Sequence, residues 1–344
     1  MATSKERTQL KRLARTIIVA QGNAFVKELL RDNGGKIGAT KKEFEKNLNA
    51  AIDEGLLTKE HFQSWLASVE GWGNQHVYLF SAPQDISASL SDAGRIKRKV
   101  AGTEYESLID ADSTLAFPKK RQLTSIQCNK TAFQLEWHSG HSRWDRYKDS
   151  DYQEERGLDR FEFRAYRERP LRTVMRFVSP PDKDYAAIFL QIPAEDVLHR
   201  EAIREIWKTV GNVSGIDVPL EPIALGEAIK NRDRQRTKRG ALPYPVSTSN
   251  SKLVTDGAYV EFGSEIPDRD YKDAPAVEQI HRAVQYDRFQ GSHGRFGLKP
   301  DKKLPLSREI KMQLYSGDNR IRIWVQCKRD DVLSVLDVIR DCHE

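Results

Sequence analysis

The spacing of apolar residues changes near residue 123, and this change limits what the chain can fold into. Between residues 5 and 80 apolar side chains recur every three to four positions, the period of an amphipathic helix. From residue 123 they alternate with polar ones, the period of a β-strand with one buried face. The sequence therefore predicts an α+β protein, with a helical N-terminal domain followed by two antiparallel sheet/helix units.

The chain has 344 residues, more than one hydrophobic core usually organises, so we expect several domains. Changes in composition predict the boundaries, in chain order: a helical module at 1–80, a connector at 81–122, an α+β unit at 123–229, a basic linker at 230–250 and a second α+β unit at 251–344. Two separate sheets, or one composite sheet, are both compatible with this order of elements.

Turn and capping residues predict where individual elements begin and end. Thr40, with Glu43 three residues later, is typical of a capping box, and the helix that it opens ends at Gly55. Residues 179–182 (Ser-Pro-Pro-Asp) predict a hairpin turn between two strands. Helices are expected at about 195–210 and 275–289, and a terminal helix from about residue 331.

Composition narrows the class of protein. The three cysteines are scattered and form no CxxC pair, which argues against a disulfide framework and a zinc ribbon and favours a reducing compartment. No stretch approaches the roughly 20 consecutive apolar residues that span a bilayer. We therefore expect an intracellular protein, in the cytoplasm and nucleoid or in a nucleus, with no membrane partner.

The basic residues are clustered. Lys and Arg number 56 against 50 Asp and Glu, a net charge of +6. One run within 230–239 contains Lys230, Arg232, Arg234, Arg236, Lys238 and Arg239 against a single acid. Shorter runs lie at 95–99 and 119–121. Such runs either follow a phosphate backbone or form solvated loops, and we expect the shorter two to be solvated.

One strand also combines cations with an aromatic ring. Alternation places Arg164, Tyr166, Arg172 and Arg176 on one face of an expected strand. Such a face either clamps single-stranded nucleic acid or is the wet side of a half-buried sheet.

Residues 25–48 contain a short motif. Leu29 and Leu30 precede a stop at Gly34, and Lys41 is followed by apolar residues three and seven positions later, Phe44 and Leu48. This pattern resembles the SAP family of helix–extended–helix DNA-binding modules, with one extra residue between Gly38 and Lys41. The resemblance implies that Lys41, Lys42 and the first N–H groups of the second helix face a phosphate. The alternative is an ordinary capped helical hairpin.

The C-terminal part has a second resemblance. It contains Phe296-Gly297, the basic loop 302–305, expected strands at 309–314 and 321–325, and a helix from Asp331. This layout, after a helical N-terminal domain, is similar to the centromere protein N family. The resemblance implies chromatin binding through the N-terminal part and pairing with a partner protein through the C-terminal sheet; fold analogy alone does not fix a function.

Enzymatic alternatives rest on few residues. His138 and His141 lie near Asp145, and divalent metal binding there is conceivable. Glu309-x-Lys311, with Asp268, resembles part of a restriction-type nuclease site, which needs converging carboxylates. The sequence contains no GxxxxGK[ST], GxGxxG, GxSxG or HExxH motif. We expect no cofactor and, on balance, no enzymatic activity.

These patterns together predict a nucleic-acid-associated adaptor with no catalytic role. Its DNA-binding residues are predicted to be Lys36, Lys41, Lys42, Arg232, Arg234, Arg236, Lys238 and Arg239, with a partner protein bound by the C-terminal sheet. A metal-dependent nuclease component is one alternative. An assembly subunit without a nucleic-acid role is the other.

Overall fold

The computed structural model describes residues 3–129, 132–192, 195–217, 219–230, 246–266, 269–285 and 289–342. Its internal contacts divide the chain into two compact units. Unit 1 consists of Met1–Leu66, Asp112–Thr124 and Trp137–Val174, and unit 2 of Ala67–Ala111, Ser125–Glu136 and Met175–Glu344. Each unit is therefore assembled from segments that lie far apart in the sequence.

The α+β class is confirmed. Ten strands form one sheet in the order β2-β3-β6-β7-β1-β12-β11-β10-β8-β9, and β4 and β5 form a separate two-stranded sheet. The strands are β1 (Gln75–Ser81), β2 (Gln122–Cys128), β3 (Phe133–Arg146), β4 (Tyr152–Arg156), β5 (Asp159–Phe163), β6 (Tyr166–Ser179), β7 (Tyr185–Leu190), β8 (Val246–Thr255), β9 (Ala258–Gly263), β10 (Gln290–Leu298), β11 (Ile310–Tyr315) and β12 (Arg320–Ile323).

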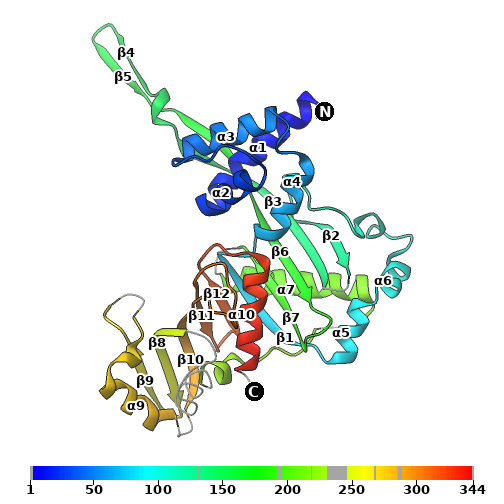
Figure 1. The fold of residues 1–344 in the computed structure, drawn as a ribbon, viewed down its shortest axis with the longest axis vertical. Coiled ribbons are helices and arrows are strands. Elements are labelled where there is room, and N and C mark those ends of the chain that lie inside the picture. Colours follow the sequence, from blue (N-terminus) through cyan, green and yellow to red (C-terminus); the bar gives the residue numbers. More distant parts are fainter. Residues whose placement is uncertain are drawn as a thin grey trace. The chain divides into compact units, whose positions relative to one another are not determined.

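Unit 1 is built around the N-terminal helices α1 (Ser4–Ala20), α2 (Gly22–Asp32), α3 (Lys41–Asp53) and α4 (Lys59–Val69) (Figure 1). The predicted capping box is present, because the Thr40 hydroxyl accepts from the Glu43 backbone N–H at 3.2 Å and the Glu43 carboxylate accepts from Thr40 N–H at 3.1 Å. Phe44, Leu48 and Ile52 face the buried core, as their spacing predicts.

A ribbon formed by β4 and β5 extends from unit 1, beyond α1–α3 (Figure 1). The chain turns at Gly157, whose φ of +66° is readily adopted by glycine. Leu158 follows and is fully exposed. The ring of Tyr152 stacks on that of Phe163 with centroids 4.5 Å apart, so one face of the ribbon is aromatic.

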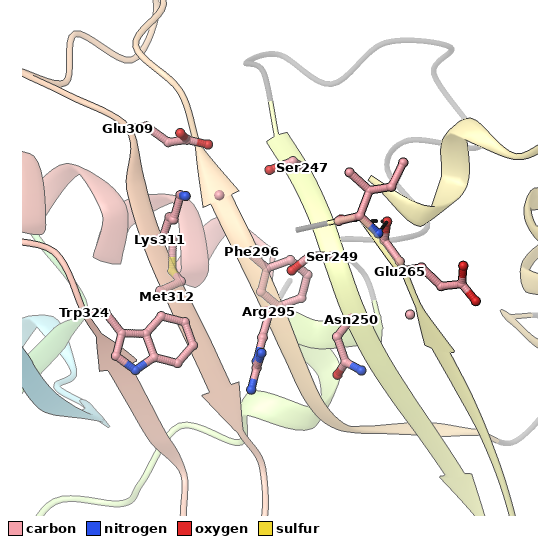
Figure 2. A pocket seen from close by; sticks show the side chains of 14 residues that line it. Ser247, Ser249, Asn250, Glu265, Arg295, Phe296, Glu309, Lys311, Met312 and Trp324 are labelled. Atoms are coloured by element: carbon pink, nitrogen blue, oxygen red, sulfur yellow. Dashed lines mark hydrogen bonds between the residues drawn. The ribbon is translucent and has the colours of Figure 1, made fainter. Parts of the chain in front are cut away.

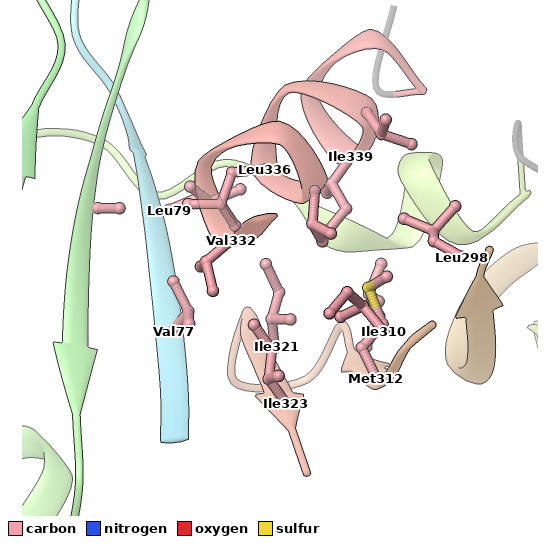
Figure 3. Close-up of a cluster of buried hydrophobic side chains, with 14 of the residues drawn as sticks. Val77, Leu79, Leu298, Ile310, Met312, Ile321, Ile323, Val332, Leu336 and Ile339 are labelled. Carbon is pink, nitrogen blue, oxygen red and sulfur yellow. The ribbon is translucent and has the colours of Figure 1, made fainter. Parts of the chain in front are cut away.

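The core of unit 2 lies between the sheet and α10 (Arg329–Asp341). Figure 3 shows Val332, Leu336 and Ile339 of this helix pointing at Ile321 and Ile310 of the strands. The opposite face of the sheet is covered over β1 and β6 by α7 (Asp196–Ser214), whose Trp207 packs against Phe80 and Phe177. A smaller cluster joins α9 (Pro275–Gln285) and η3 (Tyr271–Asp273) to β8 and β9.

The two sheet/helix units expected at 123–229 and 251–344 share this one sheet. β1 joins them, because it pairs with β7 on one side and with β12 on the other, where Gln75 is opposite Ile323. β1 itself precedes both predicted units in the chain. The expected connector 81–122 contains helices α5 (Gln84–Ser91) and α6 (Ala93–Val100) and a short η1 (Glu106–Leu108).

A buried ion pair lies in unit 2. Arg176 Nε donates to the Glu136 carboxylate at 2.6 Å, and the side chains are only 1% and 3% exposed. The guanidinium also lies over the Trp72 ring, 4.6 Å from its centroid. Since each charge has lost its water, each depends on these contacts.

Two histidine rings also lie together inside unit 2. His76 of β1 is buried, with its ring centroid 4.8 Å from that of His199 on α7, and Tyr78 Oη lies 2.5 Å from His199 Nδ1. Burial, followed by the proximity of His199, Arg320 and Arg322, lowers the pKa of His76 to about 3. His76 is therefore neutral in the folded protein at any ordinary pH.

We expect acid to destabilise unit 2 through His76. The unfolded imidazole takes up a proton below a pKa of roughly 6.5, whereas the folded one does so only near 3, so stability is lost as the pH falls below that unfolded value. The shift corresponds to about 2 kcal/mol at pH 5. Guanidinium unfolding of wild type and His76→Gln at pH 7.5 and 5 measures it. An equal pH dependence in both proteins contradicts the assignment to His76.

Candidate nucleic-acid interface

The excess of positive charge lies entirely in unit 1. This unit holds 24 of the chain's 56 Lys and Arg residues but only 17 of its 50 Asp and Glu residues, a net charge of +7. Unit 2 holds the other 32 basic and 33 acidic residues, a net charge of −1. A surface that attracts a polyanion is therefore to be sought on unit 1.

Several of these cations line a groove beside α3, here called the α3 groove, with a volume of about 740 Å³. Its basic lining residues come from α1, α3 and β6: Arg15, Lys41, Lys42, Lys46, Arg167 and Arg169. Its acidic lining residues are Glu45, Asp53 and Asp149. The six cations thus outnumber the three acids twofold, and the groove retains a positive potential.

Part of this charge is neutralised inside the groove. Arg15 Nε lies 2.9 Å and Arg167 Nη2 3.7 Å from the Glu45 carboxylate, so one acid serves two cations. Lys41 and Lys46 are exposed and form no ion pair with any residue that the structure describes. These two ammonium groups are the ones most available to an external anion.

The carboxylate of Glu43 lies at the start of α3, the helix end where the SAP resemblance implies a phosphate. The backbone N–H of Ala39 donates to the Glu43 carboxylate at 2.7 Å, and that of Thr40 at 3.1 Å. These two hydrogen bonds are the main reason why the pKa of Glu43 is lowered, so this carboxylate stays ionised. A phosphate at this helix end therefore meets the negative charge of Glu43 beside the positive charges of Lys41 and Lys42.

A second basic groove of unit 1 lies along α1, with a volume of about 820 Å³. Lys5, Arg12 and Lys119 line it, opposed by Glu168. The Arg12 guanidinium lies over the Phe117 ring, 5.2 Å from its centroid. Helix α1 therefore supplies cations to both grooves, with Arg12 in this one and Arg15 in the α3 groove.

The predicted DNA-binding residues fall into three groups. Lys41 and Lys42 lie in the α3 groove. Lys36 is exposed in the turn before α3 and lines neither groove. The others, Arg232, Arg234, Arg236, Lys238 and Arg239, lie outside the described residues.

Sequence reasoning missed Arg15, Lys46, Arg167 and Arg169. The last two belong to β6, more than 110 residues from α3 in the chain, so no local pattern connects them with Lys41. The spacing of Lys42 and Lys46, one helical turn apart, was the available signal for Lys46.

The predicted face of Arg164, Tyr166, Arg172 and Arg176 is not a nucleic-acid clamp. Arg172 is buried and donates to the carbonyl oxygens of Thr114 and Ala116 at 2.6 and 3.0 Å. Arg176 is bound to Glu136 in the interior, and Arg164 pairs with Glu162 at 3.3 Å. Arg164 lies between β5 and β6, outside either strand, and the sequence pattern could not show that the inner half of β6 is covered on both faces.

The β4–β5 ribbon is rich in arginine but carries no cationic excess. Residues 152–164 contain three arginines and four acids. Arg156 pairs with Glu154 at 2.9 Å on the same strand. The ribbon is therefore not part of the basic surface, despite its exposed aromatic rings.

The residues of the metal-site hypothesis do not converge. His138 is buried and its Nδ1 lies 2.8 Å from the Thr124 hydroxyl, whereas His141 is exposed in the groove along α1. Residues three apart on a strand point to opposite faces, which explains the separation. The described part of the chain contains no group of three or more His, Cys, Asp and Glu side chains placed to hold a metal ion.

The Glu-x-Lys pair of the nuclease hypothesis lies in a pocket of unit 2. Glu309 and Lys311 line a space of about 410 Å³, together with Glu265 and Arg295 (Figure 2). Asp268, the other predicted acid, lies outside the described residues.

Within the described ranges, every helix falls short of the length and apolar content that a membrane crossing needs. A scan against models of known protein families finds none that matches the chain, and a search of curated proteins finds no match either.

Proposed function

We propose that this protein binds DNA through the basic grooves of unit 1 and acts as an adaptor rather than as an enzyme. The observation that carries the proposal is the distribution of charge: unit 1 holds the whole positive excess of the chain, and the α3 groove has two cations for each acid. Exposed lysines without a carboxylate partner can bind phosphates, and so release counterions from the backbone, because no ion pair within the protein has to break first.

The contacts in this proposal are to phosphates. Lys41, Lys42 and Lys46 present mobile ammonium groups, and Arg15 and Arg167 share one carboxylate. Such groups neutralise a backbone without reading bases, so we expect binding that depends strongly on salt and weakly on sequence.

The adaptor part of the proposal concerns unit 2. Strand β9 is last in the sheet order, so one side of its backbone has no strand partner among the described residues. An edge strand of this kind accepts a strand from another protein by main-chain hydrogen bonding. We propose that the partner protein binds at this edge.

The DNA-binding proposal is tested by reversing two charges. Lys41→Glu/Lys46→Glu is expected to weaken binding of a labelled duplex of about 20 base pairs roughly tenfold at low salt, and to reduce the slope of log K against log salt by about 2. Fluorescence anisotropy between low and high salt measures both. A negative residue near the start of α3 favours the helix, so Lys41→Glu should not weaken the fold.

The matched control is Arg31→Glu/Lys59→Glu. These residues are exposed in unit 1 and line neither groove, and the variant has the same net charge as the first. We expect the control to retain most of its affinity. Equal losses in the two variants, or no salt-dependent binding by the wild type, exclude the α3 groove as the DNA site.

A further inference from the structure

The half-sheet β8–β12 of unit 2 leaves one face without a covering helix in the described structure. Helices α9 and α10 pack on the face that carries Leu253, Met312 and Ile323. Successive residues of a strand point to opposite faces, so their neighbours point away from these helices. Helix α7 contacts β1 and β6 on that second side. Among the described residues no helix covers β10, β11 and β12 on this second side, here called the open face.

Two rows of side chains cross this open face. The first row runs across the strands through Trp324, Lys311, Gly297 and Ser247, each next to the one before it. In the second row Arg322 is opposite Gln313, which is opposite Arg295. Figure 2 shows the indole of Trp324, the ammonium group of Lys311 and the guanidinium of Arg295 around the same hollow.

Gly297 forms the floor of the hollow. A side chain at this position would begin 2.6 Å from the Ser247 hydroxyl and 2.9 Å from a Glu309 carboxylate oxygen. With only hydrogen there, Lys311 and Ser247 stand apart and leave the pocket of about 410 Å³ between them. Its wall on the β8 side carries neutral polar groups from Ser249 and Asn250.

Trp324 is flanked by two arginines. The guanidinium carbons of Arg295 and Arg322 lie 5.7 and 5.9 Å from the centroid of its ring, within cation–π range. Neither arginine forms an ion pair with a described residue, although Glu309 and Glu265 line the same pocket. A half-buried indole near two guanidinium groups that form no ion pair with a described residue combines an aromatic surface with two anion-binding groups.

We propose that this open face binds single-stranded nucleic acid, with one base stacked on Trp324 and the adjoining phosphates held by Arg295 and Arg322. Stacking on an aromatic side chain, combined with arginine contacts to the backbone, is how sheet surfaces hold unpaired strands. A duplex keeps its bases stacked on one another and cannot offer one to Trp324. Ser249 and Asn250 supply donors and acceptors for the edge of the base.

This inference goes beyond the proposed function, since it places a second site in unit 2 and assigns it a different form of nucleic acid. It does not use Lys41, Lys46 or any other residue of the α3 groove. The two proposals can therefore fail separately.

The test compares single strands with a duplex, using the full chain. Labelled oligo(dT) and oligo(U) of about 15 nucleotides and a duplex of equal length are titrated by anisotropy, each with wild type, Trp324→Ala and Arg295→Gln/Arg322→Gln. Both variants are expected to bind the single strands roughly tenfold more weakly, because each loses the stacking platform or the phosphate contacts. Duplex binding should change by less than about twofold.

Two controls separate a binding effect from a folding effect. Trp324→Phe keeps an aromatic surface and should retain most of the single-strand affinity. Trp144→Ala removes an exposed tryptophan of unit 1 and should leave single-strand affinity unchanged. The Lys41→Glu/Lys46→Glu variant should bind the duplex more weakly, as predicted above, while its affinity for single strands is unchanged.

Three results overturn the proposal. The first is an unchanged single-strand affinity in Trp324→Ala and in the double arginine variant. The second is an equal loss of affinity for duplex and single strand. The third is that a free mononucleotide displaces the labelled strand as effectively as an unlabelled strand of the same nucleotide concentration. The first assigns the face to another kind of ligand, such as a peptide. The last assigns it to a small nucleotide.

Discussion

Glu136→Ala is expected to lower the free energy of unfolding of unit 2 by about 3–5 kcal/mol. The variant leaves the Arg176 guanidinium buried at 1% exposure without its carboxylate and removes the hydrogen bond at 2.6 Å. The Trp72 ring under the guanidinium offsets only a small part of that cost. Urea or guanidinium denaturation followed by circular dichroism gives the change in free energy.

A double variant isolates the cause of this loss. Glu136→Leu with Arg176→Met removes both charges and keeps the volume apolar, so it should be considerably more stable than Glu136→Ala. If the single alanine variant loses less than about 1 kcal/mol, the ion pair is not desolvated as the structure indicates.

Gly73→Ala is expected to be the most damaging small substitution in unit 2, with a loss of about 3 kcal/mol. A Cβ at Gly73 would lie 2.3 Å from the carbonyl oxygen of Val325 and 2.5 Å from the backbone N of Cys327. Both neighbours are main-chain atoms between β12 and α10, so neither can rotate away. Thermal or chemical unfolding of the purified variant measures the loss.

The control for this prediction is Gly317→Ala. A Cβ at Gly317 meets no atom within 4 Å, so its effect should stay within about 0.5 kcal/mol. If the two variants have equal free energies of unfolding, the backbone at Val325 and Cys327 moves away from residue 73 without an energetic cost.

Local signals in the sequence predicted the elements well. The capping box at Thr40 and Glu43 and the turn at 179–182 are both present, because each depends on residues within a few positions of one another. The terminal helix spans Arg329–Asp341, close to its predicted start. A helix from residue 275 is also confirmed.

Long-range pairing was beyond the reach of these signals. Nothing local in residues 75–78 indicates that they pair with 320–323, yet this contact turns two expected sheet/helix units into one sheet. For the same reason Arg176 was taken as a surface group, since alternation gives the face of a side chain but not what covers that face.

In the candidate sites, too, local signals predicted some residues, whereas residues brought in from distant strands were missed. Lys41 and Lys42 were predicted because they stand beside a recognisable helix start. Arg167 and Arg169 reach the groove only through the path of β6, and Trp324 joins Arg295 only through the register of three strands. A binding surface assembled from distant strands leaves no motif in one stretch of sequence.

The interleaved chain path of unit 1 decides how the protein can be dissected in the laboratory. A fragment ending at residue 80 contains all four N-terminal helices but leaves out Leu115, which belongs to their buried cluster. Such a fragment exposes a hydrophobic patch where Leu115 packs in the full chain, and it should aggregate or bind chaperones. A shortened chain in which residues 152–163 give way to a two-residue turn keeps every contributor to that cluster, and is the better choice for crystallisation.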